Sequence, residues 1–145
     1  ASAADCRYRS AVQAYGNLVN VTGDLHTIMA GLACGEGNTI GWDILKNHGT
    51  VVASCPDWMS AKATRIYANP LENDPHIISG ESGSVPLGLA YTALHDEDAK
   101  DLKEALKLDE NSNILVISTE GDTDPVRYRE IVWDGLYGTT ESLSK

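Results

Sequence analysis

The chain has 145 residues, of which 42% are hydrophobic and 22% charged, a composition typical of one globular domain that excludes a disordered chain. Its formal net charge of -10 argues against nonspecific binding to nucleic acid or to an anionic membrane surface, so small molecules or other proteins are the expected partners. The three cysteines lack metal-ligand spacing and no long apolar run is present, which favours a reduced, cytoplasmic setting.

The first part of the chain predicts few and short elements. Residues 1–10 begin without methionine in an alanine-rich run, which is more typical of a helix already under way than of a natural start. Frequent glycines then leave room for only a turn or two of helix over residues 27–34. An amphipathic pattern predicts a short helix over residues 40–46, and the apolar residues 51–53 predict a short buried strand.

The next segment predicts a helix, a strand and a second helix. The first helix has Asp57 as its cap and ends at Asn69, because the residue before a proline avoids the helical region. Residues 76–78 predict a strand. The second helix runs through residues 87–94, and we expect its cap near residues 82–84 because Pro86 is tolerated only in a first turn.

The last part of the chain predicts an amphipathic surface helix over residues 96–108 and a fully buried parallel strand over residues 114–117. A polar loop follows, and Asp124 then caps a final helix that begins at Pro125. Because strands alternate with helices, the expected fold class is α/β, a three-layer domain with a mostly parallel sheet flanked by helices.

The loop over residues 118–124 is the candidate site, since open α/β sheets bind ligands beyond the carboxyl ends of their strands. Asp122 and Asp124 can be turn and cap residues, with the neighbouring hydroxyls satisfying backbone groups. The acids of the loop can instead present oxygens to a hard cation, but the glycine precedes them and the spacing of a calcium loop is not met.

A third interpretation of this loop is a cofactor pocket in which Ser118 meets a heteroaromatic nitrogen. A serine hydroxyl donates a hydrogen bond to a pyridine nitrogen without protonating it, which a carboxylate cannot do. For pyridoxal phosphate this distinction matters, because the neutral ring is a weaker electron sink and favours elimination over long-lived carbanions.

The pattern Ser-x-x-Gly-Asp-x-Asp at residues 118–124 resembles a segment of the tryptophan synthase β family of pyridoxal phosphate enzymes, in which the serine faces the pyridine nitrogen. Almost the whole chain is also similar to the C-terminal third of the diaminopropionate ammonia-lyase family. The similar blocks follow in the same order: Ala4 to Cys6 with Tyr8 to Ser10, Thr27 to Glu36, Ile78 to Gly83, Ser118 to Asp124 and Val132 to Gly135. Gly37, Ser84 and Pro86 depart from that family's pattern.

This resemblance implies part of the large domain of a fold-type II enzyme that uses pyridoxal 5'-phosphate. The implied reaction eliminates ammonia from the amino acid 2,3-diaminopropionate and gives pyruvate and ammonia, and the implied assembly is a homodimer. Ser118 would face the pyridine nitrogen, with Thr119 as the alternative hydroxyl. Glu81, in the loop that begins at Gly80, would lie near the edge of the ring.

Residues 1–145 are accordingly expected to be the C-terminal portion of a catalytic domain. The Schiff-base lysine, the second base and the glycine-rich phosphate loop belong to the family's N-terminal part, and nothing in this chain matches them. We therefore expect no catalytic residue and no metal site here, and no activity from the chain alone. Two alternatives stay open: a noncatalytic α/β module that binds a small molecule or a metal, and another fold-type II lyase such as a serine or threonine dehydratase.

Overall fold

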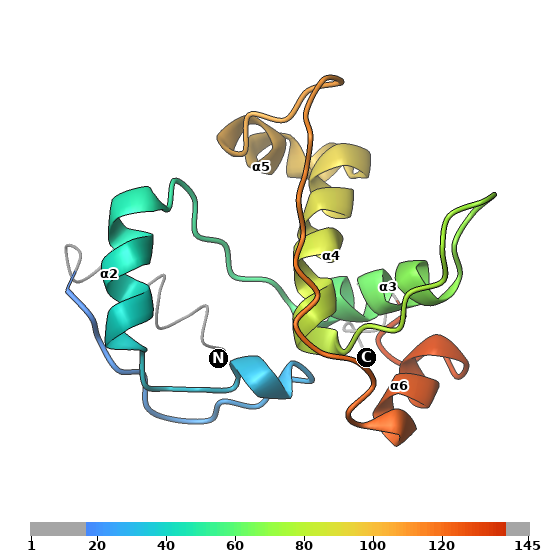
Figure 1. Ribbon diagram of the computed structural model, residues 1–145, viewed down its shortest axis with the longest axis horizontal. Coiled ribbons are helices and arrows are strands. Elements are labelled where there is room, and N and C mark those ends of the chain that lie inside the picture. The colour runs from blue at the N-terminus through green and yellow to red at the C-terminus, as the bar shows by residue number, and fades with distance from the viewer. Residues whose placement is uncertain (1–16, 139–145) are drawn as a thin grey trace. The chain divides into compact units, whose positions relative to one another are not determined.

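A computed structural model describes residues 17–138 and divides the chain into two compact units, one ending at Cys55 and the other beginning at Pro56 (Figure 1). The predictions for residues 1–10 and for the tail beyond residue 138 lie outside the described residues. The first unit contains η2 (Ala30–Leu32) and α2 (Thr39–His48). The second contains α3 (Asp57–Ala68), α4 (Glu81–His95), η3 (Glu97–Ala99), α5 (Lys100–Ala105) and α6 (Pro125–Val132).

The predicted α/β fold is wrong, because no strand forms within residues 17–138. The segments at residues 51–53, 76–78 and 114–117 are irregular backbone, not paired strands. The last of them was expected to be buried, yet Leu115 is 89% exposed and Ile117 is 68% exposed. Consecutive apolar residues favour an extended, buried chain, but a parallel strand also needs neighbours that share its backbone hydrogen bonds. None of the described segments supplies such neighbours.

Most of the predicted helices are present. The helix expected over residues 40–46 is α2, whereas residues 27–34 contain only η2. The helix expected over residues 96–108 is divided into η3 and α5, and the side chain of Asp96 caps η3 by accepting the N–H of Asp98 at 3.0 Å. Helical periodicity therefore located these elements without fixing their lengths. None of the described helices is long and apolar enough to cross a membrane.

The helix ends show which capping predictions hold. Asp124 caps α6 as predicted, its Oδ1 accepting the N–H of Arg127 at 3.0 Å, with Pro125 in the first turn. The cap of α3 is Pro56, so Asp57 lies inside the first turn, where its negative charge favours the helix dipole.

The predicted start of α4 is wrong. This helix begins at Glu81 with Gly80 as its cap, so Pro86 lies inside it and breaks one backbone hydrogen bond. The first turn is instead held by tertiary contacts, one of which is a buried bond of 2.5 Å from the Ser60 hydroxyl to the carbonyl oxygen of Glu81. Contacts from outside the helix therefore extend α4 beyond what its own sequence predicts.

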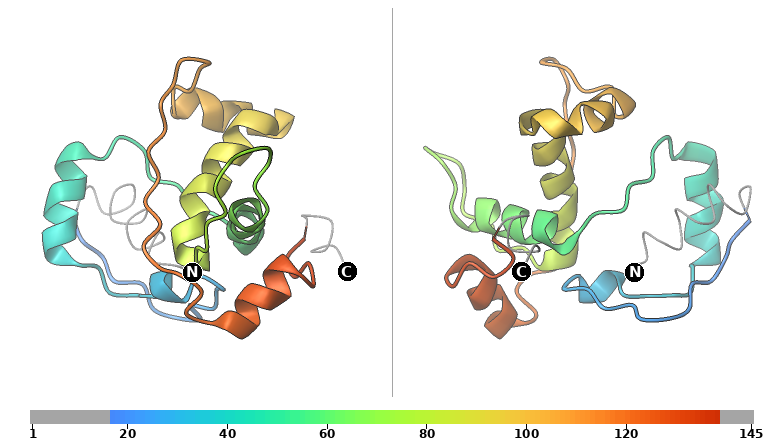
Figure 2. Two further views of the ribbon diagram at one scale, coloured as in Figure 1. Left: turned by 45° about the vertical axis from the view of Figure 1, so that its right-hand side comes forward. Right: turned by 180° about the vertical axis from the view of Figure 1, so that it is seen from behind.

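Small side chains let α3 and α4 pack closely. Ala61 and Ala63 of α3 are fully buried. A Cβ atom on Gly88 of α4 would lie 2.8 Å from the carbonyl carbon of Met59, well inside an ordinary contact. Figures 1 and 2 show α5 and α6 near opposite ends of α4, with α6 beside α3. The crossing of α3 and α4 is thus the centre of the second unit.

Arg65 of α3 forms hydrogen bonds with backbone carbonyl groups at the end of α6 and in the segment that follows it. Its guanidinium donates to the carbonyl oxygens of Ile131 (3.2 Å), Leu136 (3.0 Å), Tyr137 (3.1 Å) and Gly138 (3.5 Å). Burial lowers the pKa of Arg65, although a guanidinium stays charged at any ordinary pH. Because α6 begins directly after the loop at residues 118–124, this anchor also restrains the C-terminal end of the candidate site.

Candidate functional site

The two polar loops that the sequence singled out lie side by side in the second unit. The N–H of Gly80 donates to the carbonyl oxygen of Glu120 at 3.0 Å, and the N–H of Ser82 donates to Glu120 Oε1 at 3.2 Å. The first N–H groups of a helix have no partners within it and carry partial positive charge. Glu120 therefore caps α4 from the opposite loop and joins the two loops into one site.

Two glycines allow this close approach. A Cβ atom on Gly80 would lie 2.5 Å from the carbonyl oxygen of Gly121. A Cβ atom on Gly83 would lie 3.0 Å from Ser118 Oγ, Ser79 Oγ and the backbone nitrogen of Thr119. The first turn of α4 thus lies directly against the residues predicted to meet the cofactor.

Ser118 is hydrogen-bonded to a second serine. Its hydroxyl oxygen lies 2.7 Å from that of Ser79, which is fully buried, and 3.3 Å from the carbonyl oxygen of Glu120. Ser118 and Thr119 are both exposed, and the Thr119 side chain makes no hydrogen bond with any residue that the structure describes. Ser118 is therefore an exposed residue whose hydroxyl is hydrogen-bonded to a buried one, that of Ser79.

Glu81 lies in the same first turn and is 8% exposed. Its Oε1 atom and the Ser82 hydroxyl are buried without a hydrogen-bond partner among the described residues. Burial is the main cause that raises the pKa of the Glu81 carboxyl, and the negative charges of Glu120 and Asp124 raise it further. A hydrogen bond from the backbone N–H of Glu81 and the positive charge of Arg127 lower this pKa, but each effect is smaller than that of burial. Buried polar atoms without partners are uncommon in proteins, so this turn offers groups for a polar ligand.

Two acidic side chains of the loop at residues 118–124, those of Asp122 and Asp124, interact with residues of α6. Asp124 caps α6, which agrees with its interpretation as a cap residue. Asp122 adds to burial in raising the pKa of Tyr128, whose hydroxyl is buried without a partner among the described residues. Within residues 17–138 no group of three His, Cys, Asp or Glu side chains could hold a metal ion.

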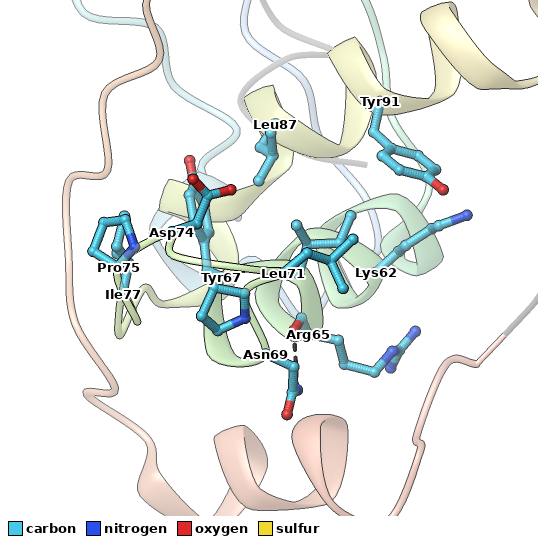
Figure 3. A pocket seen from close by; sticks show the side chains of 12 residues that line it. Lys62, Arg65, Tyr67, Asn69, Leu71, Asp74, Pro75, Ile77, Leu87 and Tyr91 are labelled. Atoms are coloured by element: carbon cyan, nitrogen blue, oxygen red, sulfur yellow. Dashed lines mark hydrogen bonds between the residues drawn. The ribbon is translucent and has the colours of Figure 1, made fainter.

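A pocket of about 650 Å³ lies apart from these loops, between α3, the segment 69–77 and α4 (Figure 3). In Figure 3, Lys62 and Tyr91 lie on one side of it and Pro75 and Ile77 on the other. The ammonium of Lys62 stands 4.2 Å from the centroid of the Tyr91 ring, an attractive cation–π distance. None of the predicted site residues lines this pocket.

Sequence reasoning missed Ser79 and the capping role of Glu120. A signal for Ser79 was available, because it ends the apolar run Ile77-Ile78 just as Ser118 ends the run Val116-Ile117. The glutamate carried no such signal, since only the folded chain brings it to the start of α4.

Comparisons with known proteins agree with the resemblance in the sequence. No family model matches the chain. The diaminopropionate ammonia-lyase of Escherichia coli is 53% identical over 134 residues, which cover 92% of this chain and 33% of that protein. The diaminopropionate ammonia-lyase of Salmonella typhimurium is 47% identical over 133 residues, which cover 91% of this chain and 33% of that protein. The chain therefore spans about a third of the length of the curated relatives it matches.

Solved structures of the Escherichia coli enzyme have the same fold as the described residues. Its complex with an aminoacrylate-PLP azomethine reaction intermediate matches with a TM-score of 0.76 and 46% identity, over 92% of this chain and 33% of that one. Its apo form matches with a TM-score of 0.61 and 43% identity, over 70% of this chain and 28% of that one. By sequence and by structure, the chain is homologous to a segment that makes up about a third of the length of the diaminopropionate ammonia-lyases.

Proposed function

We propose that residues 1–145 form the C-terminal portion of the catalytic domain of an ammonia-lyase that uses pyridoxal 5'-phosphate. Its substrate is 2,3-diaminopropionate, its products are pyruvate and ammonia, and it works as a cytoplasmic homodimer. The proposal is supported by the identity of 53% to the Escherichia coli enzyme and by the complex of that enzyme with a PLP-bound intermediate. Because nothing in the chain matches a Schiff-base lysine or a phosphate loop, the chain alone is expected to be inactive.

The hydroxyl of Ser118, paired with Ser79 at 2.7 Å, is the observation that carries the proposal. Bound pyridoxal phosphate supplies an electron sink for elimination. Ser118 donates a hydrogen bond to its pyridine nitrogen and leaves that nitrogen unprotonated, because a serine hydroxyl is far too weak an acid to transfer its proton. Thr119 is the alternative donor. The hydroxyl group on this loop thus sets the electronic state of the ring.

The first turn of α4 also fits such a group. Burial raises the pKa of the Glu81 carboxyl, and a carboxyl group at this position would be able to form hydrogen bonds at the edge of a ring. The buried Ser82 hydroxyl and Glu81 Oε1 have no hydrogen-bond partners among the described residues, so a polar ligand would supply the missing hydrogen bonds. Gly80 keeps this turn close to the loop that holds Ser118.

The test uses the full-length protein that carries this chain, reconstituted with pyridoxal phosphate. We expect it to release pyruvate from 2,3-diaminopropionate, and we expect Ser118→Asp to lower kcat strongly because a carboxylate would stabilise a protonated ring. Release of ammonia from serine or threonine, but not from 2,3-diaminopropionate, would identify a dehydratase instead. Tight binding of magnesium or calcium with no response to pyridoxal phosphate would identify a binding module.

A further inference from the structure

Ser79 has no assigned role, yet it is the residue in closest contact with the Ser118 hydroxyl. It is fully buried at the end of the segment before α4. Its hydroxyl oxygen lies 2.7 Å from Ser118 Oγ and 3.2 Å from the carbonyl oxygen of Gly80. Each serine hydroxyl has one proton to donate and two lone pairs, so the pair has two possible proton arrangements.

The acceptors around Ser79 favour one of these arrangements. The carbonyl oxygen of Gly80 already accepts two bonds, from the Ser84 N–H at 3.0 Å and the Ser84 hydroxyl at 2.9 Å. A carbonyl oxygen has two lone pairs, so a third and longer bond from Ser79 is the weakest of the three. The better acceptor for the proton of Ser79 is therefore Ser118 Oγ.

The proton of Ser118 is then left with only a weak internal acceptor. The carbonyl oxygen of Glu120 is 3.3 Å away and already accepts the N–H of Gly80 at 3.0 Å. A hydroxyl that accepts one hydrogen bond becomes a better donor of the next, because bonds in a chain polarise one another. Since Ser118 is exposed, its proton is available to an acceptor outside the loop.

We infer that Ser79 is a positioning residue that directs the Ser118 proton away from the protein and toward the acceptor nitrogen of a bound heteroaromatic ring. This inference rests on the proposed function of Ser118. Ser79 touches no ligand itself and acts only through the hydroxyl of Ser118.

The test is a double-mutant cycle on the full-length apoprotein, with pyridoxal phosphate as the probe and its dissociation constant as the first readout. Ser79→Ala should weaken binding about threefold to tenfold, the range that one hydrogen bond between neutral groups supplies. In a Ser118→Ala background, Ser79→Ala should have no further effect. The second readout is the NMR shift of the isotope-labelled ring nitrogen, which should move toward its value without a hydrogen bond in both single variants.

Thr92→Val is the matched control, because it removes another buried hydroxyl, in α4, which donates to the carbonyl oxygen of Gly88 at 2.8 Å and takes no part in the bonds of Ser79, Gly80 and Ser118. It should leave the ring nitrogen shift unchanged. Ser79→Cys keeps a weaker donor and should give a smaller change than Ser79→Ala, which provides a second variant if the alanine protein does not fold.

The outcomes separate this inference from the proposed function. Equal effects of Ser79→Ala with and without Ser118 would overturn the inference, because Ser79 would then act on the structure in general. A nitrogen shift that moves with Ser118→Ala but not with Ser79→Ala would also overturn it and leave the proposed function intact. No response of binding or shift to Ser118→Ala would overturn the proposed function itself.

Discussion

Gly88→Ala tests the packing that places the first turn of α4. Alanine is favoured over glycine inside a helix by about 1 kcal/mol, so helix propensity alone predicts a more stable protein. The new Cβ atom would, however, lie 2.8 Å from the carbonyl carbon of Met59 and closer still to its oxygen. Carbon atoms in contact prefer roughly 3.5–4.0 Å, so α3 and α4 must separate by roughly 1 Å.

The cost of this separation decides the sign of the effect. Met59 lies inside α3, so its carbonyl group cannot turn aside without breaking the helix. Overpacking of a close contact typically costs about 1–3 kcal/mol, and here the buried small residues around the crossing also lose contacts. After subtraction of the gain in helix propensity, we expect a net loss of about 1 kcal/mol in the free energy of unfolding.

The assay is the thermal unfolding midpoint of the full-length apoprotein, followed by circular dichroism. Gly41→Ala in α2 is the matched control, because its new Cβ atom would meet nothing closer than Asn38 Oδ1 at 3.4 Å. The midpoint should fall for Gly88→Ala and stay level or rise for Gly41→Ala. An unchanged or higher midpoint for Gly88→Ala would refute the close crossing of α3 and α4.

Three further changes test the surroundings of the site. Asp124→Ala removes the cap of α6 and should cost about 1 kcal/mol of unfolding free energy, whereas Asp122→Ala, which caps no helix, should cost clearly less; equal losses would contradict the capping role. The raised pKa of Glu81 means that the folded protein binds this proton more tightly than the unfolded chain, so stability falls as pH rises above the ordinary value of 4.5. Glu81→Gln should therefore stabilise the apoprotein at neutral pH and lose this advantage in acid, and parallel stability curves for the two proteins would exclude a raised pKa. Arg65→Met leaves the carbonyl groups after α6 without their donor and should cost about 2 kcal/mol in urea unfolding, with partial recovery in Arg65→Lys; no loss would show that this anchor is unimportant.

The proximity of the two candidate loops was better predicted from the sequence than the fold was. The serine and acids after residue 117 and the glycines around Glu81 carried the resemblance, and the structure brings these two loops together. The cap at Asp124 and the start at Pro125 were predictable because both depend on residues next to one another in the chain.

The sheet could not be predicted correctly, because pairing of strands is a property of distant segments. The apolar residues 114–117 specify an extended chain, but they contain no information on whether a neighbour is present to pair with it. The start of α4 was misplaced for a related reason, since Ser60 and Glu120 hold its first turn from other parts of the chain. Ser79 was missed because its importance comes from a contact with Ser118 across 39 residues.

The central claim is that Ser118 donates to the pyridine nitrogen of pyridoxal phosphate. A crystal structure of the full-length protein with the bound cofactor tests this most directly. We predict that Ser118 Oγ lies within about 3.2 Å of the ring nitrogen, with Ser79 Oγ still hydrogen-bonded behind it. A carboxylate or a water molecule as the only partner of that nitrogen, with Ser118 turned away, would contradict the account.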